Sequence, residues 1–349
     1  MDEFLPLPRL EQILTRVRAL RAGVVGDFTL DGYWFADMTR STLSRETPLF
    51  PRPVVREQYS CGGAANVAWN LAALGAADVR AFTVLGNDWR GGLLIQVLRE
   101  AGVDPRGVLA APGWITPFFG KVILQADRLQ QEDARLDFIN TQPLSPESET
   151  ALLARIEAAL PELDVLVVAD YQAVGVIPPR VLQGLNDLAR RFPQVIFAVD
   201  SRERIGSFTN MVLKPNDVEA ARWLFPGRPA AQVGVDELAG AALRMQAECA
   251  GAGGRGCPLF ITMGERGCLV AAGGESRLVP AVPVPPPIDP VGAGDTFLSA
   301  LALALAAGAS PAEAARLGHL AAAVTIRKLG ITGAASPEEV LAVAAGAGK

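Results

Sequence analysis

The segment IDPVGAGDTFLSALALAL, residues 288–305, joins a glycine-rich turn to a long apolar helix. Gly292, Ala293 and Gly294 come immediately before that helix, so free backbone N–H groups and the positive end of the helix dipole meet at the turn and predict an anion site. Asp295 follows in the first helical turn. Its carboxylate is placed to accept the proton of a hydroxyl that attacks a phosphoryl group, although an aspartate there also commonly serves the helix alone.

Upstream of this segment, short apolar runs alternate with helical patterns along most of the chain. Strands that alternate with helices indicate βαβ units and a mostly parallel sheet covered on both faces, so we expect one α/β domain over residues 1–349. Ligands of such sheets bind outside the carboxyl ends of the strands. We therefore expect the functional residues at the polar and glycine positions that end the apolar runs. These positions are Asp31, Gly86, Asp170, Asp200, Asn216 and Gly264.

Two stretches break this alternation. Residues 33–60 and 117–138 combine strand-forming residues with charged faces and turn residues. We expect both to form an antiparallel β-flap that stands off the main sheet.

Composition excludes several classes of partner. The chain has 32 Lys plus Arg against 37 Asp plus Glu, a net charge of −5, so its overall charge gives no reason to expect nucleic-acid binding. Residues 1–20 lack the pattern of a secretory signal, and the apolar stretch 297–308 is shorter than the ~20 residues that span a bilayer. We therefore expect a cytoplasmic protein without a membrane anchor. The cysteines, whose spacing predicts reduced core thiols, are Cys61, Cys249, Cys257 and Cys268.

A second glycine motif, SCGGAANVAWNLAALGA, begins at Ser60 and runs into an amphipathic helix. Gly62 and Gly63 allow a ligand to approach the backbone closely, and Asn66 offers both a donor and an acceptor to a polyol. Close helix packing by small residues is the alternative explanation.

The segment KPNDVEAARWL, from residue 214, places Asn216 and Glu219 on one face of a helix start. Such a pair forms a capping box, and near phosphates it can also organise Mg²⁺ through water. The segment alone leaves both roles open.

Two further motifs and the single histidine do not have the sequence context that a functional site requires. GAGGRG, residues 251–256, follows a helix and precedes a strand, the reverse of the dinucleotide-binding order, so we interpret it as a loop. Gly120 and Lys121 lack the spacing of a phosphate-binding P-loop. His319 is the only histidine, which excludes a histidine-based triad or metal cluster and favours a packing or surface role.

Taken together, GGAANVA at 62, NDVE at 216, TMGERG at 262 and DPVGAGDTF at 289 resemble the PfkB carbohydrate kinases of the ribokinase-like fold. Their order and separation match that family from about residue 22 to residue 330. The resemblance implies ATP-dependent phosphorylation of a sugar or related alcohol, with Mg²⁺, on a central sheet that carries a β-lid formed by the two inserts. It leaves open whether a monovalent cation takes part. By analogy with the family, we also expect a homodimer formed through the lid.

The resemblance also implies roles for single residues. Asp295 resembles the base, and the turn from Gly292 to Gly294 resembles the hole for the γ-phosphate charge. Asn216 and Glu219 match a metal and phosphate position, where Glu219 would hold Mg²⁺ through water. The matched sugar-hydroxyl contacts are Asp31, Gly62, Gly63 and Asn66, and the matched nucleotide-side loop residues are Thr262, Gly264 and Gly267.

Within the family, GDFTLDGYWFAD, KVILQADRLQQEDARLDF and the strand end VADY are similar to the heptose 7-phosphate kinases. This likeness makes Lys121, Arg128 and Arg135 candidates for gripping a sugar phosphate, because a phosphate calls for charge-assisted donors. Solvated lid charges are the alternative explanation of these three residues.

The chain departs from that subgroup at two places. VADYQAVG lacks the glycine–lysine pair that usually follows DY, and DSRERIG replaces a DPK-like segment. A neutral sugar or sugar acid, of the ribose, fructose or ketogluconate type, is therefore the alternative acceptor. A noncatalytic scaffold is the alternative of another class, and the presence of Asp295 argues against it.

Overall fold

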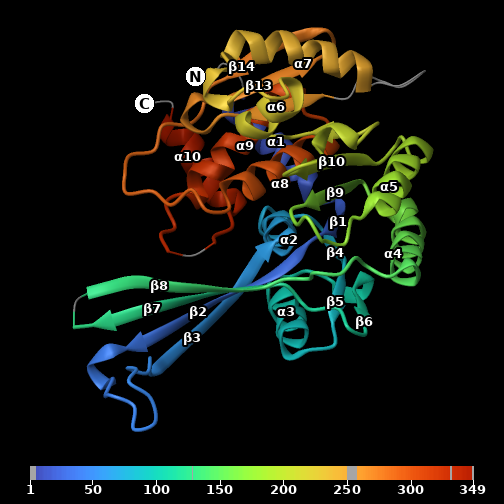
Figure 1. Ribbon diagram of the computed structural model, residues 1–349. Coiled ribbons are helices and arrows are strands. Elements are labelled where there is room, and N and C mark those ends of the chain that lie inside the picture. The colour runs from blue at the N-terminus through green and yellow to red at the C-terminus, as the bar shows by residue number, and fades with distance from the viewer. Residues whose placement is uncertain (1–4, 128, 250–257, 331, 348–349) are drawn as a thin grey trace.

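The computed structural model describes residues 5–127, 129–249, 258–330 and 332–347 (Figure 1). Within these residues, eight strands form the main sheet in the order β14-β13-β12-β11-β10-β9-β1-β4. Parallel pairing runs from β4 to β12, and β13 and β14 add an antiparallel edge. The predicted mostly parallel α/β sheet is therefore confirmed. The strands are β1 (Arg21–Gly26), β4 (Asp78–Phe82), β9 (Val165–Asp170), β10 (Ile196–Ser201), β11 (Val212–Leu213), β12 (Leu259–Thr262), β13 (Cys268–Ala272) and β14 (Glu275–Val279).

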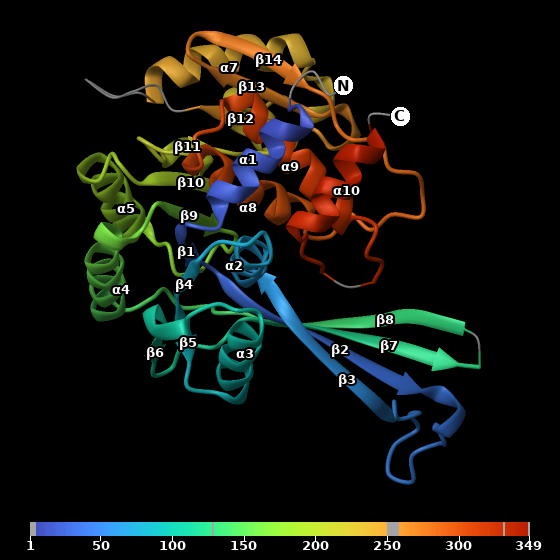
Figure 2. The same ribbon diagram turned by 180° about the vertical axis from the view of Figure 1, so that it is seen from behind.

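Helices cover both faces of this sheet, because the central strands are apolar on both sides. In β9, Val165 and Val167 belong to the core on one face, and Leu166 and Val168 to the core on the other. The first face is covered by α1 (Leu7–Val17), α2 (Ala64–Ala73), α8 (Ala293–Ala306), α9 (Pro311–Thr325) and α10 (Pro337–Ala347) (Figure 2). The second is covered by α4 (Pro146–Ala159), α5 (Pro179–Arg191), α6 (Asp217–Leu224) and α7 (Val235–Cys249). No helix of the described residues is long and apolar enough to cross a membrane.

The two inserts form one projecting sheet, which we call the lid (Figures 1 and 2). Its strand order is β3-β2-β7-β8. The predicted β-flap is confirmed, but it is not wholly antiparallel, since β2 and β7 pair in parallel and join two antiparallel hairpins. Near the lid root lie α3 (Trp89–Glu100) and a small sheet of β5 (Val84–Gly86) and β6 (Leu109–Ala111). The lid strands are β2 (Phe28–Asp37), β3 (Val54–Gly63), β7 (Phe118–Ala126) and β8 (Leu129–Phe138).

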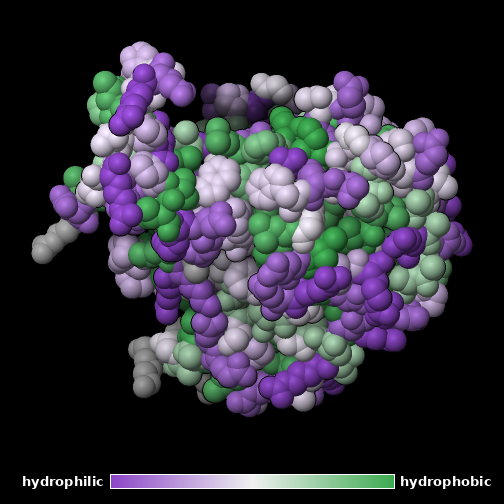
Figure 3. Space-filling model, turned by 90° about the horizontal axis from the view of Figure 1, so that it is seen from below, coloured by the Kyte–Doolittle hydropathy of each residue, from purple (hydrophilic) through white to green (hydrophobic). Residues whose placement is uncertain are grey.

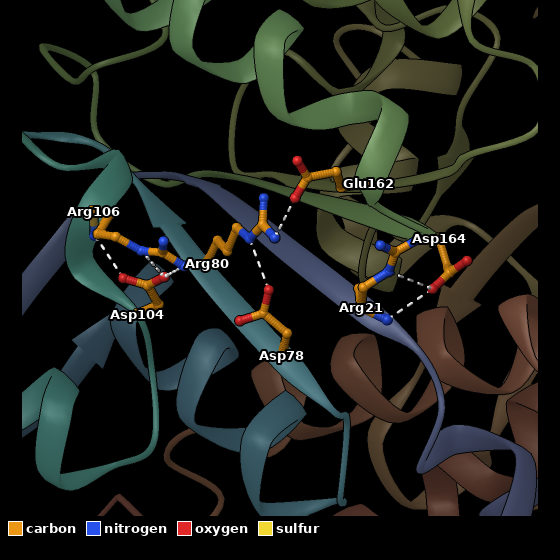
Figure 4. A network of polar contacts seen from close by, with 7 residues as sticks. All are labelled: Arg21, Asp78, Arg80, Asp104, Arg106, Glu162 and Asp164. Carbon is orange, nitrogen blue, oxygen red and sulfur yellow. Dashed lines mark hydrogen bonds and ion pairs between the residues drawn. The ribbon is translucent and has the colours of Figure 1, made fainter.

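Ion pairs line the amino edge of the main sheet (Figure 4). Arg80 lies 2.7 Å from Asp78 and 2.6 Å from Glu162, and the backbone N–H of Arg21 donates to Asp164 at 2.8 Å. These acids pair with Arg80 in β4 and with Arg21, the first residue of β1. The unsatisfied polar groups described below lie instead at the carboxyl edge.

Candidate active site

A cleft of about 680 Å³ opens at the carboxyl edge of the main sheet. Its walls come from the ends of β10, β11 and β12 and from α6, α8 and α9. The structure thus brings together segments separated by more than a hundred residues in the chain. Among the predicted residues that line the cleft are Asn216, Glu219, Thr262, Gly264, Ala293 and Gly294.

The glycine-rich turn begins α8. Gly292 is the N-cap with φ +79°, a left-handed conformation that favours glycine, and a Cβ there would lie 2.9 Å from Asn66 Nδ2. The N–H of Ala293 donates to the Pro290 carbonyl at 3.1 Å, and that of Thr296 donates to the Gly292 carbonyl at 3.0 Å. The backbone N–H groups of Gly294 and Asp295 therefore have no backbone acceptor among the described residues at this helix start.

Asp295 is partly buried and held at both carboxylate oxygens. Asn66 Nδ2 donates to Oδ2 at 2.8 Å, and the Tyr171 hydroxyl donates to Oδ1 at 2.8 Å. Burial raises the pKa of Asp295 to about 6, while these two hydrogen bonds oppose the rise. The carboxylate is thus a stronger base than an exposed aspartate and still mostly ionised at pH 7.

A chain of buried polar side chains holds Asn66 in place. Asn70 Nδ2 donates to Asn66 Oδ1 at 3.1 Å, and Thr296 Oγ1 donates to Asn70 Oδ1 at 2.9 Å. These contacts fix the orientation of the Asn66 amide, with its nitrogen toward Asp295. Asn66 therefore holds Asp295, in addition to the sugar contact that its sequence motif predicts.

Unsatisfied polar atoms gather at the root of the lid. Asp31 and Thr29 lie on β2, and Ser60 lies opposite Asp31 on β3. Thr332 lies beside the Gly292 turn and near enough to Asp31 to lower the pKa of that carboxyl. A Cβ at Gly62 would overlap both Asp31 Oδ1 and Thr29 Oγ1, so glycine keeps this space open. Because buried polar atoms normally have partners, this cluster fits a ligand rich in hydroxyls. Within the described residues, its buried atoms without a hydrogen-bond partner are Thr29 Oγ1, Asp31 Oδ1, Ser60 Oγ and Thr332 Oγ1.

Lys121 and Arg135 share the lid face of Asp31. Lys121 pairs with Tyr33 on β2 and with Arg135 on β8, and alternation along the strands turns Asp31, two residues from Tyr33, to the same side. Burial raises the pKa of Asp31 to about 6, and the charges of Lys121 and Arg135 oppose the rise. Glu132 lies 4.0 Å from Lys121 Nζ, and Asp137 accepts two hydrogen bonds from Arg135.

A second cleft, of about 340 Å³, separates the lid from the turn before α8. Tyr33 and Lys121 line it on the lid side, and Asp289 and Val291 line it on the opposite side. Arg128, the third predicted cation, lies outside the described residues.

Asn216 and Glu219 form the predicted capping box at the start of α6. Asn216 Oδ1 accepts the N–H of Glu219, and Glu219 Oε2 accepts the N–H of Asn216, both at 2.8 Å. The nearby β12–β13 turn has positive φ at Gly264 and Gly267, and a Cβ at Gly267 would overlap the Val279 carbonyl. Thr262 donates its N–H to Pro215 and thereby joins this turn to the α6 start.

Glu219 fits a magnesium ion held through water. The cap uses Oε2, which leaves Oε1 as a hard oxygen donor, and burial together with the charge of Asp200 raises the pKa of Glu219. A cation would relieve that repulsion. Within the described residues no group of three or more His, Cys, Asp or Glu could hold a metal ion by itself.

Sequence reasoning missed Lys214 and Tyr171. Lys214 is buried, and its Nζ lies 2.9 Å from Asp200 Oδ2 and 4.0 Å from where a Cβ of Gly294 would be. Burial lowers the pKa of Lys214, but its pairing with Asp200 outweighs burial and raises that pKa, so the ammonium stays charged. The available signal was a lysine at the end of the apolar run MVLK.

Many residues that line the main cleft are apolar. Val284, Ile288 and Ala322 are among its lining residues, together with Phe297 and His319. His319 is buried with its ring centroid 5.1 Å from that of Phe297, and burial lowers its pKa to about 4. The histidine is thus a neutral packing residue, as predicted. Of the cysteines, Cys61 and Cys268 are buried free thiols, and Cys257 lies outside the described residues.

Asp27 anchors the loop that follows β9. Its carboxylate accepts the N–H groups of Tyr171 and Gln172 at 2.8 Å and that of Val176 at 2.9 Å. Burial raises the pKa of Asp27 to about 6 against these hydrogen bonds. One side chain therefore holds in place the loop from which Tyr171 reaches Asp295.

Asp27→Ala is expected to lower the free energy of unfolding by about 3 kcal/mol, because it leaves three buried N–H groups without an acceptor. Urea denaturation measures the loss. Asp187→Ala, which removes an exposed pair with Arg190, is the control and is expected to cost less than about 0.5 kcal/mol. Equal losses in the two variants would contradict the anchoring role.

Comparisons with known proteins identify relatives of this chain. The sequence profile described as pfkB family carbohydrate kinase matches residues 50–338. Curated relatives include the "Bifunctional protein HldE" of Geotalea uraniireducens, 34% identical over 335 residues, and that of Trichlorobacter lovleyi, 34% identical over 336 residues. Each match covers 95% of this chain and 64% of the relative, so the chain spans a little less than two thirds of those proteins.

Solved structures show the same fold. Phosphofructokinase-2 from Escherichia coli in complex with fructose-6-phosphate has a TM-score of 0.68 at 21% identity, covering 95% of this chain and 100% of that one. Ribokinase from Arabidopsis thaliana, complexed with ribose and ATP, has a TM-score of 0.64 at 20% identity, covering 93% and 98%. The predicted ribokinase-like α/β fold is therefore confirmed.

Proposed function

Because the chain belongs to the pfkB family of carbohydrate kinases, we propose that it transfers the γ-phosphoryl group of ATP to a hydroxyl group of a sugar. One juxtaposition carries this proposal. The base Asp295 lies between the hydroxyl-binding cluster at the lid root and the glycine turn beside Lys214. A hydroxyl acceptor and a phosphoryl donor would therefore meet at Asp295.

In the proposed reaction, Asp295 accepts the proton of the attacking hydroxyl. The N–H groups at the start of α8 and the ammonium of Lys214 stabilise charge on the transferring phosphoryl group. The apolar lining residues of the main cleft would contact the adenine base, and Glu219 would hold Mg²⁺ through water. When bound, Mg²⁺ neutralises charge on the phosphates.

The acceptor we propose is a sugar phosphate, with heptose 7-phosphate as the first candidate. Lys121 supports it because it lines the second cleft, and Arg135 supports it because it pairs with Lys121 across β7 and β8. The relatives named HldE and the resemblance to heptose 7-phosphate kinases support it as well. A neutral sugar or sugar acid is the second candidate, and the acidic neighbours Glu132 and Asp137 favour it, since they partly neutralise the two cations.

Lys121→Ala and Arg135→Ala are each expected to raise KM for a phosphorylated acceptor about tenfold or more, because each removes a charge-assisted contact to the phosphate. KM for the matching neutral sugar should stay within about twofold. A coupled assay of ADP formation, run on neutral sugars paired with their phosphates, measures both.

Arg40→Ala is the matched control, since Arg40 pairs with Asp37 beyond the end of β2 and does not line either cleft. Equal effects of the lid variants on the phosphorylated and neutral sugars would contradict the phosphate grip. ATP turnover on neutral sugars alone would assign the chain to another branch of the family. Folded, ATP-binding protein without turnover on any acceptor would favour a scaffold.

We also propose a homodimer formed through the lid, in the cytoplasm, where ATP is supplied. The lid carries exposed apolar side chains, including Val54 and Val55 on β3 and Leu129 and Leu136 on β8. Hydrophobic residues lie among hydrophilic ones on the part that projects at the left of Figure 3. Burying them against a second copy would shield the lid from water. Equilibrium sedimentation of the wild type and of Leu136→Asp tests this association.

A further inference from the structure

Tyr171 lies between two carboxylates at the carboxyl edge of the main sheet. It directly follows β9, and its hydroxyl donates to Asp295 Oδ1 at 2.8 Å and lies 3.5 Å from Asp200 Oδ2. No motif used above assigns it a role. The hydroxyl therefore joins the base to the carboxylate that pairs with Lys214.

The position of Tyr171 is fixed from several directions. Its backbone N–H donates to Asp27, and the guanidinium of Arg202 lies over its ring, 5.3 Å from the centroid. Burial, followed by the charges of Asp295 and Asp200, raises the pKa of Tyr171 well above its ordinary value. The phenol thus stays protonated, and its single O–H donates to Asp295, the nearer of the two carboxylates.

We propose that Tyr171 is a positioning residue for Asp295. The Tyr171 hydroxyl fixes the orientation of the Asp295 carboxylate and favours its ionised, proton-accepting form. Asn66 holds Oδ2 from α2 and Tyr171 holds Oδ1 from the end of β9, so two separate elements define the carboxylate plane. Each oxygen keeps a second lone pair, so the acceptor hydroxyl can still donate to it. The inference rests on the proposed kinase function.

Other charged groups act on Asp295 as well. Asp200 on β10 raises the pKa of Asp295, and Lys214 after β11 lowers it. The carboxyl of Asp31, on the lid, also interacts electrostatically with Asp295. Removing the Tyr171 hydroxyl leaves all three in place, so the change in proton affinity reports on that hydroxyl.

Tyr171→Phe tests the proposal because it deletes a single oxygen atom. With one stabilising hydrogen bond lost, the pKa of Asp295 should rise, and the acid limb of the kcat–pH profile should move up by about one pH unit. The variant should therefore lose several-fold more activity at pH 6 than at pH 8, while KM for ATP changes little. Tyr59→Phe is the matched control, since the Tyr59 hydroxyl donates to Glu57 on the lid. A fall in kcat by the same factor at every pH, or no fall, would overturn the proposal.

Two further measurements separate this inference from the proposed function. The ¹³C carboxyl resonance of Asp295, identified by its loss in Asp295→Asn, should titrate at higher pH in Tyr171→Phe, and an unchanged titration would overturn the proposal whatever the acceptor is. If Tyr171→Phe does not fold, incorporation of fluorotyrosine is the alternative test. The chain has only three tyrosines, and the more acidic phenol of fluorotyrosine is a stronger hydrogen-bond donor. It should move the same titration to lower pH, and an unmoved titration would again overturn the proposal.

Discussion

Asp295→Asn is expected to lower kcat by about 10²–10⁴-fold, with KM for the sugar changed far less. The amide has the shape of the carboxylate but does not accept the proton of the attacking hydroxyl. Asn66, the Gly292 turn and the lid-root cluster remain in place to bind the substrates. Steady-state ADP formation gives kcat and KM, and calorimetric titration gives the acceptor Kd.

Asp164→Asn is the matched control for this change. Asp164 pairs with Arg21 at the amino edge of the sheet, opposite the site, so the same substitution there should leave kcat within about twofold (Figure 4). An Asp295→Asn enzyme with unchanged kcat would contradict the assignment of the base.

Lys214→Met is expected to lower kcat by about 10²–10³-fold and the free energy of unfolding by about 3–5 kcal/mol. The loss of activity follows from removing the cation beside the glycine turn. The loss of stability follows from leaving Asp200 buried without its partner 2.9 Å away. Steady-state kinetics and urea denaturation measure the two effects.

The double variant Lys214→Met, Asp200→Asn separates these effects. Neutralising Asp200 should recover most of the lost stability, because no unpaired charge remains buried. It should not recover kcat, because the phosphoryl group still lacks its cation. Recovery of both would mean that Lys214 serves only to pair with Asp200.

The sequence predicts the main sheet well because each of its strands is marked by a short apolar run. Apolar runs such as VLVVAD and VIFAVD are strands buried on both faces, β9 and β10. The parallel pairing of β2 with β7 could not be predicted, since it joins residues about ninety positions apart and depends on packing at the lid root. The sequence pattern therefore predicts an antiparallel lid and misses this parallel pair.

The sequence predicts those candidate site residues that belong to a short motif with a recognisable local structure. The turn before Asp295 and the cap at Asn216 are of this kind. Tyr171 and Lys214 follow buried strands without such a motif, and only the sheet order brings them to Asp295 and Asp200. Thr332 reaches the lid root from the far end of the chain, a contact that no local pattern contains.

The central claim is that the γ-phosphoryl group of ATP passes to the hydroxyl of a sugar phosphate held between the lid and Asp295. Its most direct test is a ³¹P NMR time course of the full chain with ATP, Mg²⁺ and heptose 7-phosphate. We predict a new sugar-phosphate resonance whose intensity corresponds to one phosphorylated sugar for each ADP formed. This resonance should be absent with Asp295→Asn. ATP consumption that yields only inorganic phosphate, or a new sugar-phosphate resonance that persists undiminished in Asp295→Asn, would contradict the account.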